Sequence, residues 1–397
     1  MSNTKLKFID LFSGIGGFHY ALKELGHEWV FASDIDKYAK DVYEKNHHSK
    51  VDGDITKINI ADIPNHDILC AGFPCQPFSN AGHKMGFEDK TRGTLFHTIV
   101  EILKFHKPKY IFLENVKHLA KHDRGNTYKI IKESLENIGY AISDNSLILS
   151  PHRFGIPQRR ERIYILGILK DDKFTDNFLD IDTSDITYTE KNIIDENIIE
   201  GSDLYLKYKI SDEEERVLNA WDEFIKKFQN KFSGFPIYVD FFEYSGPRVG
   251  LQKWKLDYIH KNENFYNQNK KEIGVWINKY NVKDFSIRDR KFEWQAGKDI
   301  HSVWDTFIQY RQSGIRCKKP TYFPTLVAMV QTPIIGRLKR RLTPREASRL
   351  QSFPDDFELD PVDRRAYKQF GNSVNVDVVK YLANKLLNYK NEKQNSI

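Results

Sequence analysis

Residues 8–18, FIDLFSGIGGF, join an apolar stretch to a helix through a glycine-rich turn, and this arrangement sets the expected fold. The apolar residues that follow keep helical spacing: Phe18, Ala21, Leu22 and Leu25. Glycines in such a turn let the backbone approach a ligand closely. A dinucleotide-binding turn would need glycine or alanine where His19 stands, and the chain has no GKS or GKT, so the stretch fits neither the NAD nor the P-loop template.

Similar strand and helix patterns recur up to about residue 170. The strand-like stretches are WVFAS at 29–33, HDILCAG at 66–72, KYIFLEN at 109–115 and RIYILGIL at 162–169. Helical patterns follow the first three of these stretches, and one of them stops before Pro108. Alternation of this kind predicts an α/β, Rossmann-like fold with a mostly parallel sheet covered by helices.

The chain has 397 residues, which is more than one core usually holds, so we expect two lobes. Composition changes at Lys170, because residues 171–200 contain ten acids and two bases. Residues 311–350, in contrast, contain ten Arg or Lys and a single acid, Glu346, in a chain with a net charge of +6. The basic stretch predicts contact with a polyanion, and the acidic stretch should lie away from it.

Cysteine usage and hydropathy indicate the compartment. The three cysteines, Cys70, Cys75 and Cys317, match no zinc or disulfide spacing, which favours a reducing environment. The N-terminal stretch has no signal-peptide core, and no apolar run approaches the roughly 20 residues of a membrane helix. We therefore expect a cytoplasmic protein without a membrane segment.

Cys75 stands in the loop GFPCQPFS, residues 72–79, where Pro74 and Pro77 restrict the directions open to its side chain. The loop follows a strand, so it lies at the carboxyl edge of the sheet, where open α/β folds bind ligands. Glu114 ends the next strand, and the two groups could face one substrate as nucleophile and acid. The alternatives are a buried structural cysteine and a surface or helix-capping acid.

Two aspartates and two arginines extend the candidate site. Asp34 follows Gly14 by 20 residues at a strand end, where a carboxylate commonly binds ribose hydroxyls, and Asp54 ends a third strand-like stretch. A nucleoside ligand without phosphates fits S-adenosylmethionine better than ATP or NAD, and two ordinary surface aspartates are the alternative. Arg160 and Arg162 are two apart at a strand start, so both could hold a phosphate or carbonyl oxygen, or form a solvated basic edge.

Taken in order, six stretches resemble the motifs of the DNA cytosine-5 methyltransferase family. They are FIDLFSGIGGF, GFPCQPFS, ENV, QRRER, RLTPREASRLQSFP and QFGNSVNV, and they cover roughly residues 1–170 and 335–385. The resemblance implies an S-adenosylmethionine-dependent enzyme whose C-terminal segment returns to the first lobe. It implies a catalytic domain of residues 1–170 and 361–397, and a target-recognition domain of residues 171–360 that includes the TPRE segment.

The same resemblance implies roles for single residues. Cys75 would attack C6 of a cytosine flipped out of duplex DNA, while Glu114 would stabilise the ring at N3 and the amino group. Arg162 would contact the flipped base, and Arg160 would support the loop or a phosphate. No metal is implied. The cofactor contacts would be Phe12, Gly14, Gly16, Asp34, Ile35, Asp54, Leu95 and Asn372.

The resemblance also implies a partner and a biological role. The partner would be a specific double-stranded DNA sequence, and the role the modification half of a restriction-modification system, with a cognate endonuclease that acts on the same site without contacting this protein. RCKKP with TYFPTL is expected on the DNA-reading face, and RLKRRLTPR is expected to clamp phosphates. Three alternatives stay open: a methyltransferase acting on tRNA, a non-catalytic DNA-binding regulator on the same scaffold, and, from the glycine turn alone, a nucleotide-dependent oxidoreductase.

Overall fold

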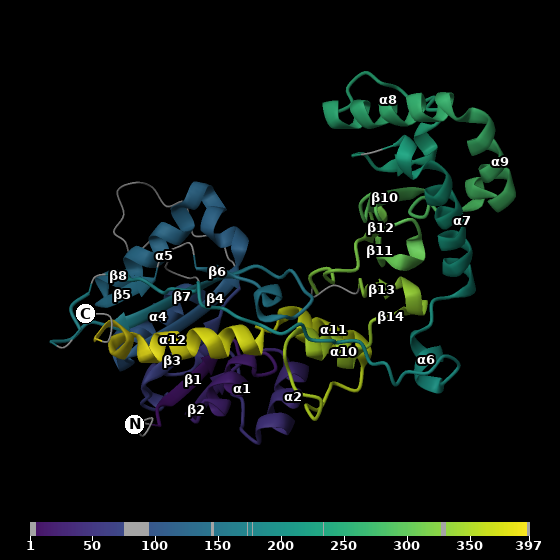
Figure 1. Cartoon of the computed structure of the whole chain (residues 1–397). Helices are drawn as coiled ribbons and strands as arrows, with labels where there is room; N and C mark the ends of the chain where they lie inside the picture. The colour runs from purple at the N-terminus through teal and green to yellow at the C-terminus, as the bar shows by residue number, and fades with distance from the viewer. Residues whose placement is uncertain are drawn as a thin grey trace. The chain divides into compact units, whose positions relative to one another are not determined.

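The computed structural model describes residues 5–74, 95–143, 147–172, 174–176, 178–232, 234–326 and 331–394 (Figure 1). The chain divides into two compact units. The first unit comprises Met1–Ile193, Thr325–Met329 and Pro344–Ile397, and the second comprises Ile194–Pro324 and Val330–Thr343. Both ends of the chain therefore belong to the same unit.

An eight-stranded sheet forms the centre of the first unit, in the order β2-β1-β3-β4-β7-β5-β8, with β6 paired to β7. Its strands are β1 (Lys7–Leu11), β2 (Glu28–Ser33), β3 (Ile68–Gly72), β4 (Tyr110–Val116), β5 (Tyr140–Ser143), β6 (Ile148–Leu149), β7 (Arg162–Leu169) and β8 (Phe178–Leu179). Strand β7 runs antiparallel to its three partners, whereas the other neighbouring pairs are parallel. The expected mostly parallel α/β sheet is confirmed.

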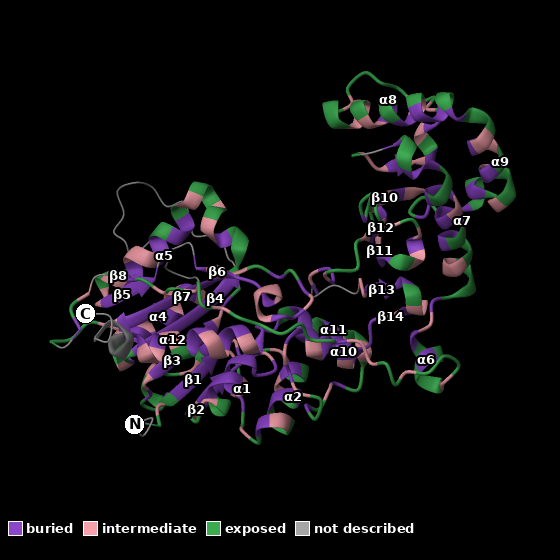
Figure 2. Cartoon of the chain, in the orientation of Figure 1, coloured by how far each residue is buried: buried purple, intermediate pink, exposed green. Residues whose placement is uncertain are grey.

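Helices cover this sheet. Strands covered in this way are buried on both faces, which explains their nearly continuous apolar sequences. The helices are α1 (Gly17–Glu24), α2 (Lys37–His47), α4 (Leu95–His106), α5 (Asn126–Asn137), α10 (Pro344–Leu350), α11 (Asp363–Asn372) and α12 (Val376–Gln394). In β1, every residue from Phe8 to Leu11 is buried, and Figure 2 shows the same burial along the central strands. Among the described residues, no helix has the length and apolar character that a membrane span requires.

The C-terminal helix α12 packs against α1, as the expected return of the chain to the first lobe requires. A Cβ atom at Gly17, the first residue of α1, would lie 2.7 Å from Val374 Cγ2. Farther along the two helices, Lys380 Nζ lies 2.6 Å from Glu24 Oε2. The small residue at position 17 therefore allows the C-terminal segment to approach the glycine turn.

The second unit has its own sheet and an aromatic core. The sheet order is β14-β13-β11-β12-β10-β9. Its strands are β9 (Ile237–Tyr238), β10 (Lys291–Gln295), β11 (Phe307–Arg311), β12 (Gly314–Lys318), β13 (Ile334–Ile335) and β14 (Arg340–Arg341), and its helices are α6 (Asp203–Tyr208), α7 (Asp212–Phe228), α8 (Lys253–Gln268) and α9 (Lys270–Tyr280). Trp221 of α7 stacks on Phe292 of β10, with ring centroids 4.5 Å apart, and lies 5.1 Å from Trp276 of α9. These rings join helices and sheet into one core.

The unit boundaries differ from those that the sequence predicts. The sequence places residues 171–193 and 344–360 in the recognition domain, whereas their contacts place them in the first unit. Strand β8 pairs with β5, and Asn375 Nδ2 donates a hydrogen bond to Leu350 O at 3.2 Å. Most of the acidic stretch after Lys170 therefore belongs to the first unit, and the change in composition at Lys170 does not mark the boundary between the units.

Candidate active site

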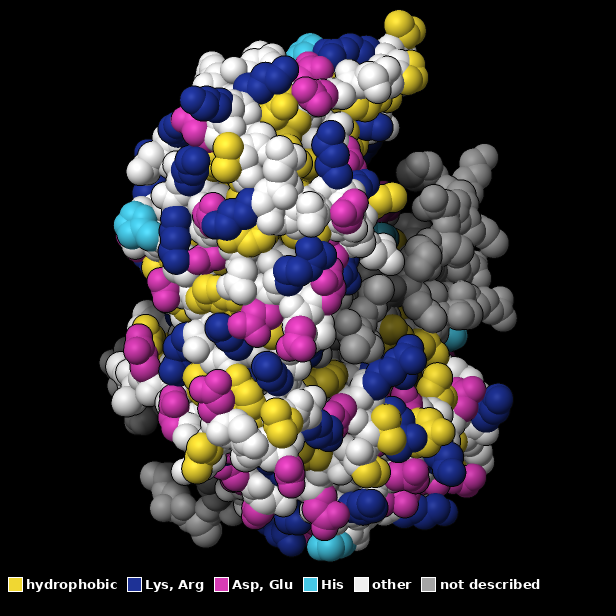
Figure 3. All heavy atoms as spheres, turned by 90° about the vertical axis from the view of Figure 1, so that its right-hand side faces the viewer, with side chains coloured by type: hydrophobic (Ala, Val, Ile, Leu, Met, Phe, Trp, Pro, Cys, Tyr) yellow, Lys and Arg dark blue, Asp and Glu magenta, His cyan; other side chains and the backbone are white. Residues whose placement is uncertain are grey.

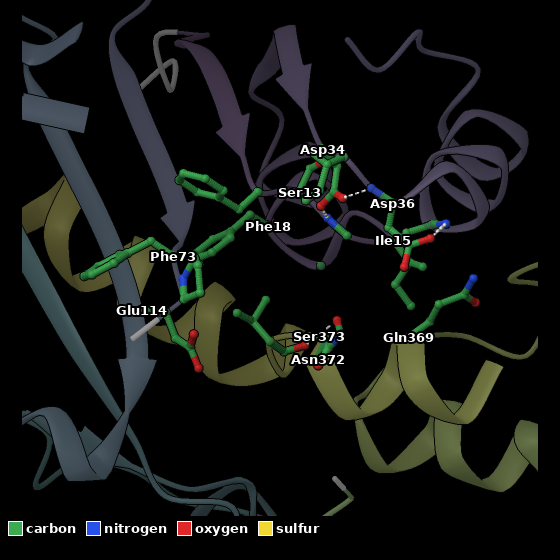
Figure 4. A pocket seen from close by; sticks show the side chains of 18 of the residues that line it. Ser13, Ile15, Phe18, Asp34, Asp36, Phe73, Glu114, Gln369, Asn372 and Ser373 are labelled. Carbon is green, nitrogen blue, oxygen red and sulfur yellow. Dashed lines mark hydrogen bonds between the residues drawn. The ribbon is translucent and has the colours of Figure 1, made fainter. Parts of the chain in front are cut away.

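A cavity of about 550 Å³ lies at the carboxyl ends of β1 to β4 in the first unit (Figure 4). Strand β2 lies on one side of β1 and β3 on the other, so the strand order reverses here, and open α/β sheets bind ligands at such a point. The lining includes Glu114, Arg160 and Arg162. It also includes seven of the eight predicted cofactor contacts: Phe12, Gly14, Asp34, Ile35, Asp54, Leu95 and Asn372.

Asp34 joins the glycine turn to the end of β2. Its Oδ2 accepts a hydrogen bond from Gly14 N at 2.8 Å, and its Oδ1 accepts one from Asp36 N at 2.7 Å. Burial raises the pKa of the Asp34 carboxyl, although the two amides oppose the shift. Each carboxylate oxygen has a second lone pair, so Asp34 can hold the turn and still accept hydrogen bonds from the hydroxyl groups of a ligand.

Gly16 is the predicted cofactor contact that does not line the cavity. It precedes α1 with a left-handed φ of +86, and a Cβ atom there would lie 2.3 Å from His47 Nε2. The packing of the turn on α2 is therefore sufficient to require glycine at this position.

His19, which breaks the dinucleotide template, is a core residue behind the turn. Its Nδ1 lies 2.7 Å from Tyr43 Oη, and its ring stacks on the His47 ring with centroids 4.0 Å apart. Burial lowers the pKa of His19 to about 2 and that of His47 to about 4. Both imidazoles are therefore neutral near pH 7, and they act as packing groups between α1 and α2.

Ile35 and Asp54 form an open wall of the cavity. The Ile35 side chain is 80% exposed, so a bound ligand would gain by covering it. Asp54 caps the short 3-10 helix Ile55–Lys57 and does not end a strand. Its Oδ1 accepts hydrogen bonds from Thr56 N and Oγ1, which lower the pKa of the Asp54 carboxyl.

Two side chains of α11 bridge to α2 at the rim of the cavity, and neither is predicted from the sequence. Lys368 Nζ lies 2.8 Å from Asp36 Oδ2, and Gln369 Nε2 donates to a backbone carbonyl of α2 at 3.2 Å. Figure 4 shows Gln369 and Asn372 across the cavity from Asp34. Helical spacing could have pointed to Lys368. It precedes the predicted cofactor contact Asn372 by four residues, and residues four apart lie on one face of a helix.

Glu114 and Arg162 form a buried ion pair at the ends of β4 and β7. Arg162 Nε lies 3.1 Å from Glu114 Oε1, and the two side chains are only 16% and 11% exposed. Burial raises the pKa of Glu114, while the guanidinium groups of Arg162 and Arg160 oppose the rise. A carboxyl group under such opposing influences is suited to proton transfer or to hydrogen-bond donation.

Arg160 is buried, and its guanidinium joins three segments of the chain. Its Nη1 donates to Leu326 O at 2.8 Å, and its Nη2 donates to Gly371 O at 2.8 Å and Ser373 O at 2.9 Å. Burial lowers its pKa to about 9, so the group stays charged near pH 7. Because three of its five donors bond these carbonyls, the geometry of Arg160 fits the loop-supporting role.

Cys75 lies outside the described residues, but the chain that leads to it is held in place. Phe73 and Pro74 line the cavity, and Asn115 Nδ2 donates to Phe73 O at 2.8 Å. Asn115 is buried next to Glu114 at the end of β4. Asn115 therefore fixes the position of the residues that lead into the cysteine loop. The ENV motif alone does not reveal this role.

The charges of the lining suit S-adenosylmethionine better than a nucleotide phosphate. Each cation that the described chain contributes to the lining already has a protein partner; these are Arg160, Arg162 and Lys368. The acids of the same lining are Asp34, Asp36, Asp54 and Glu114. Ser13 Oγ is buried in the lining with no hydrogen-bond partner among the described residues, so it can bind a polar group of the ligand. The cavity has a size typical of small-ligand sites, and the residues present fit this cofactor.

A cavity at the reversal point of this sheet, in which the cations of the described lining all have protein partners, fits an S-adenosylmethionine-dependent methyltransferase. The family model of the C-5 cytosine-specific DNA methylases matches residues 6–388, and the chain belongs to that family. The predicted fold, the class of DNA (cytosine-5-)-methyltransferase and the cofactor used by this family are thereby confirmed, and the oxidoreductase alternative is wrong.

Relatives match along nearly the whole chain. Type II methyltransferase M.HhaI from Haemophilus parahaemolyticus is 32% identical over 390 residues, which are 98% of this chain and 97% of that protein. Type II methyltransferase M.AluI from Cellulosimicrobium cellulans is 32% identical over 480 residues, covering 96% of this chain and 92% of that protein. The crystal structure of the S. pombe Dnmt2 methyltransferase has the same fold, with a TM-score of 0.53 and 21% identity over 98% of this chain and 100% of its own.

Proposed function

We propose that the protein methylates C5 of a cytosine within a specific double-stranded DNA sequence, as the modification half of a restriction-modification system. The observation that carries the proposal is the buried Glu114–Arg162 pair in the same cavity as the glycine turn. The type II relatives support DNA as the substrate and the restriction-modification role. A cognate endonuclease would act on the same site without contacting this protein.

Cys75, which follows Pro74 at the cavity, supplies the nucleophile in this proposal. Its thiolate adds to C6 of a cytosine flipped out of the duplex, an S–C6 bond forms, and the electron pair of the C5–C6 double bond moves into the ring toward C5 and N3. When bound, S-adenosylmethionine supplies an electrophilic methyl group, which C5 takes. Loss of the C5 proton to a water molecule then re-forms the C5–C6 double bond as the S–C6 bond breaks and the thiolate leaves.

Glu114 and Arg162 act on the ring during this addition. Negative charge develops at N3, and a protonated Glu114, favoured by its raised pKa, donates a hydrogen bond there. Arg162 holds the Glu114 carboxyl through Nε and bonds the carbonyl of its neighbour through Nη1. Its remaining nitrogen, Nη2, is assigned to the carbonyl oxygen of the base.

The second unit is the target-recognition domain in this proposal, within Ile194–Pro324 and Val330–Thr343. Its separate aromatic core gives a rigid support for side chains that read bases. The first unit, with the cofactor cavity, carries out the methyl transfer.

The test is transfer of labelled methyl from S-adenosylmethionine to unmethylated duplex DNA, with tRNA in parallel and bisulfite mapping of the product. Cys75→Ser should abolish transfer and retain cofactor binding, whereas Cys317→Ala, which removes a buried thiol of the second unit, should keep transfer. Methylation of tRNA alone would support the RNA alternative. DNA binding without transfer would support the regulator, and substantial transfer by Cys75→Ser would exclude Cys75 as nucleophile.

A further inference from the structure

The sheet of the second unit has an apolar face and a polar face. Side chains alternate along each strand, so Phe292 of β10 and Ile315 of β12 point into the core with α7. Glu293 follows Phe292 and Arg316 follows Ile315, so both side chains lie on the opposite face. There Arg316 is in register with Glu293 on one side and with Gln309 of β11 on the other. We call this surface the polar face; its residues are Tyr238, Lys291, Glu293, Gln309, Arg311 and Arg316.

Glu293 holds two arginines on the polar face. Its Oε2 accepts a hydrogen bond from Arg316 Nε at 3.0 Å and another from Arg311 Nη2. Arg311 and Arg316 are 18% and 25% exposed, so their guanidinium groups are partly desolvated while still reachable from solvent. Two guanidinium groups on one carboxylate leave a net positive charge at the centre of this face.

The pairing with Glu293 leaves hydrogen-bond donors of both arginines available. Within the described part of the chain, Arg316 bonds Glu293 through Nε alone, and its two terminal nitrogens keep their donors. Arg311 bonds Glu293 through Nη2, so its Nη1 keeps its donors among the same residues, whereas its Nε is buried. A planar guanidinium held at one edge and free at the other has the geometry that binds O6 and N7 of guanine.

Aromatic side chains continue the polar face beyond the arginines. Tyr238 of β9 pairs with Lys291 of β10 and therefore lies on the same face. The Tyr238 ring is 6.0 Å from the Tyr258 ring, which is 5.8 Å from Trp254, a side chain that is 55% exposed. Rings with polar tips beside arginines are typical of binding surfaces and not of a purely solvated sheet.

The opposite side of the second unit has a different character. Figure 3 shows Lys and Arg intermixed with Asp and Glu over the face that carries α7 and α9. There Arg216 pairs with Glu213 of the same helix, and Lys279 pairs with Glu223. Surface pairs of this kind cancel each other locally, so this side offers no single-sign patch to a polyanion.

The basic run predicted to clamp phosphates is also engaged by acids. Arg337 lies 3.2 Å from Glu196, and Arg341 bonds Glu214 at the start of α7. Arg340 between them is only 1% exposed. This stretch therefore serves the internal structure of the second unit, which leaves the polar face as the stronger candidate for contact with bases.

We propose that Arg316 and Arg311, held by Glu293 on the polar face, read guanine bases in the major groove of the DNA that the enzyme methylates. This inference rests on the proposed function, because it takes duplex DNA as the partner. Arginine donating two hydrogen bonds to one guanine is the commonest specific contact of this kind. Glu293 acts as a positioning residue that fixes the orientation of both guanidinium groups.

The experiment selects duplexes from a randomised pool by binding to the full-length protein with S-adenosylhomocysteine, and sequences the selected DNA. Arg316→Lys keeps the charge and removes the two-pronged contact. It should lose the preference for guanine at one position and bind the duplex preferred by the unmodified protein roughly 5- to 150-fold more weakly. Arg216→Lys is the matched control, because it alters an exposed arginine that already pairs with an acid on the other side of the same unit.

Glu293→Gln distinguishes base reading from a purely structural role. If the arginines read bases, freeing them from Glu293 should broaden the selected sequence at both positions with cofactor affinity unchanged. A lower melting temperature with an unchanged selected sequence would overturn the proposal, as would equal weakening on all sequences or no sequence selection by the unmodified protein. Sequence-selective binding without methyl transfer to the selected duplex would instead contradict the proposed function alone.

Discussion

Glu114 obtains its environment from the strand that precedes it. Residues 110–113 are apolar and buried, so β4 delivers the carboxyl group into a site from which water is largely excluded. Burial raises its pKa and the guanidinium of Arg162 limits the rise. A neutral, hydrogen-bond-donating carboxyl group therefore becomes accessible at a pH where an exposed glutamate is ionised.

Glu114→Gln should slow methyl transfer about 10²- to 10³-fold, because glutamine keeps the shape but its amide is a weaker hydrogen-bond donor to the charge that develops at N3. Cofactor affinity should change little, since Glu114 donates no bond to the glycine turn. Single-turnover methylation of duplex DNA measures the effect, with Glu161→Gln as control, because Glu161 is half exposed and pairs with Lys117. A near-normal rate for Glu114→Gln would mean that another group is the acid.

At the scale of elements, α1 packs on α2 through neutral histidines. The His19 and His47 rings stack behind the glycine turn, and Gly16 leaves room for the His47 ring. Burial holds their folded-state pKa values at about 2 and about 4, below the unfolded value near 6.5. Above pH 6.5 neither state binds these protons, whereas below it the unfolded chain binds them first.

Stability should therefore be lost as the pH falls from 6.5 toward the folded-state pKa values. Between pH 7 and pH 5 each of the two histidines should lower the free energy of unfolding by about 2 kcal/mol. Urea denaturation at both pH values measures the loss, and His47→Gln should reduce it by about 2 kcal/mol. His48→Gln, at the exposed neighbouring position, is the control. An equal loss of stability in His47→Gln and the unmodified protein would contradict the assignment.

The elements themselves were predictable wherever an apolar run ends in a polar residue. Glu114 and Asp34 were found at the cavity because strand ends meet at one edge of a parallel sheet. Gly14 and Gly16 look equivalent in the sequence. They differ in the structure, because Gly14 faces the cavity whereas Gly16 packs against His47, which lies farther along the chain. Likewise, the carbonyls that bind Arg160 lie 166 or more residues away, so no local pattern could identify its role.

At the scale of the whole molecule, the two cores predict two unfolding events. Saturating S-adenosylhomocysteine at about 100 times its Kd should stabilise the first unit by about 2.7 kcal/mol, because only that unit carries the cavity. Trp276→Ala should destabilise the second unit by about 3 to 5 kcal/mol, because Trp276 is 2% exposed in its aromatic core.

Scanning calorimetry of the full chain measures both transitions. The ligand should move one transition and Trp276→Ala the other. Ile131→Ala, in the core of the first unit, is the matched control and should lower the transition that the ligand raises. A single transition that responds to all three changes would show that the units unfold together.

Domain boundaries were the least predictable feature at this scale. The share of charged residues indicates which parts of the chain are exposed to water. This share changes at Lys170, although the chain remains in the first unit up to Ile193. The resemblance to the family predicts the TPRE segment, residues 343–346, in the recognition domain. Its contacts with the C-terminal segment, such as the bond from Asn375 to Leu350, place it elsewhere.

The bond between Lys368 and Asp36 spans 332 residues of sequence, and it has a consequence for biosynthesis. A ribosome releases the glycine turn long before α11, so the growing chain lacks one rim of its cofactor cavity until α11 has emerged. Polypeptides cut short before α11 should therefore bind no cofactor, however well their first strands fold. A message interrupted before α11 should therefore yield an inert product.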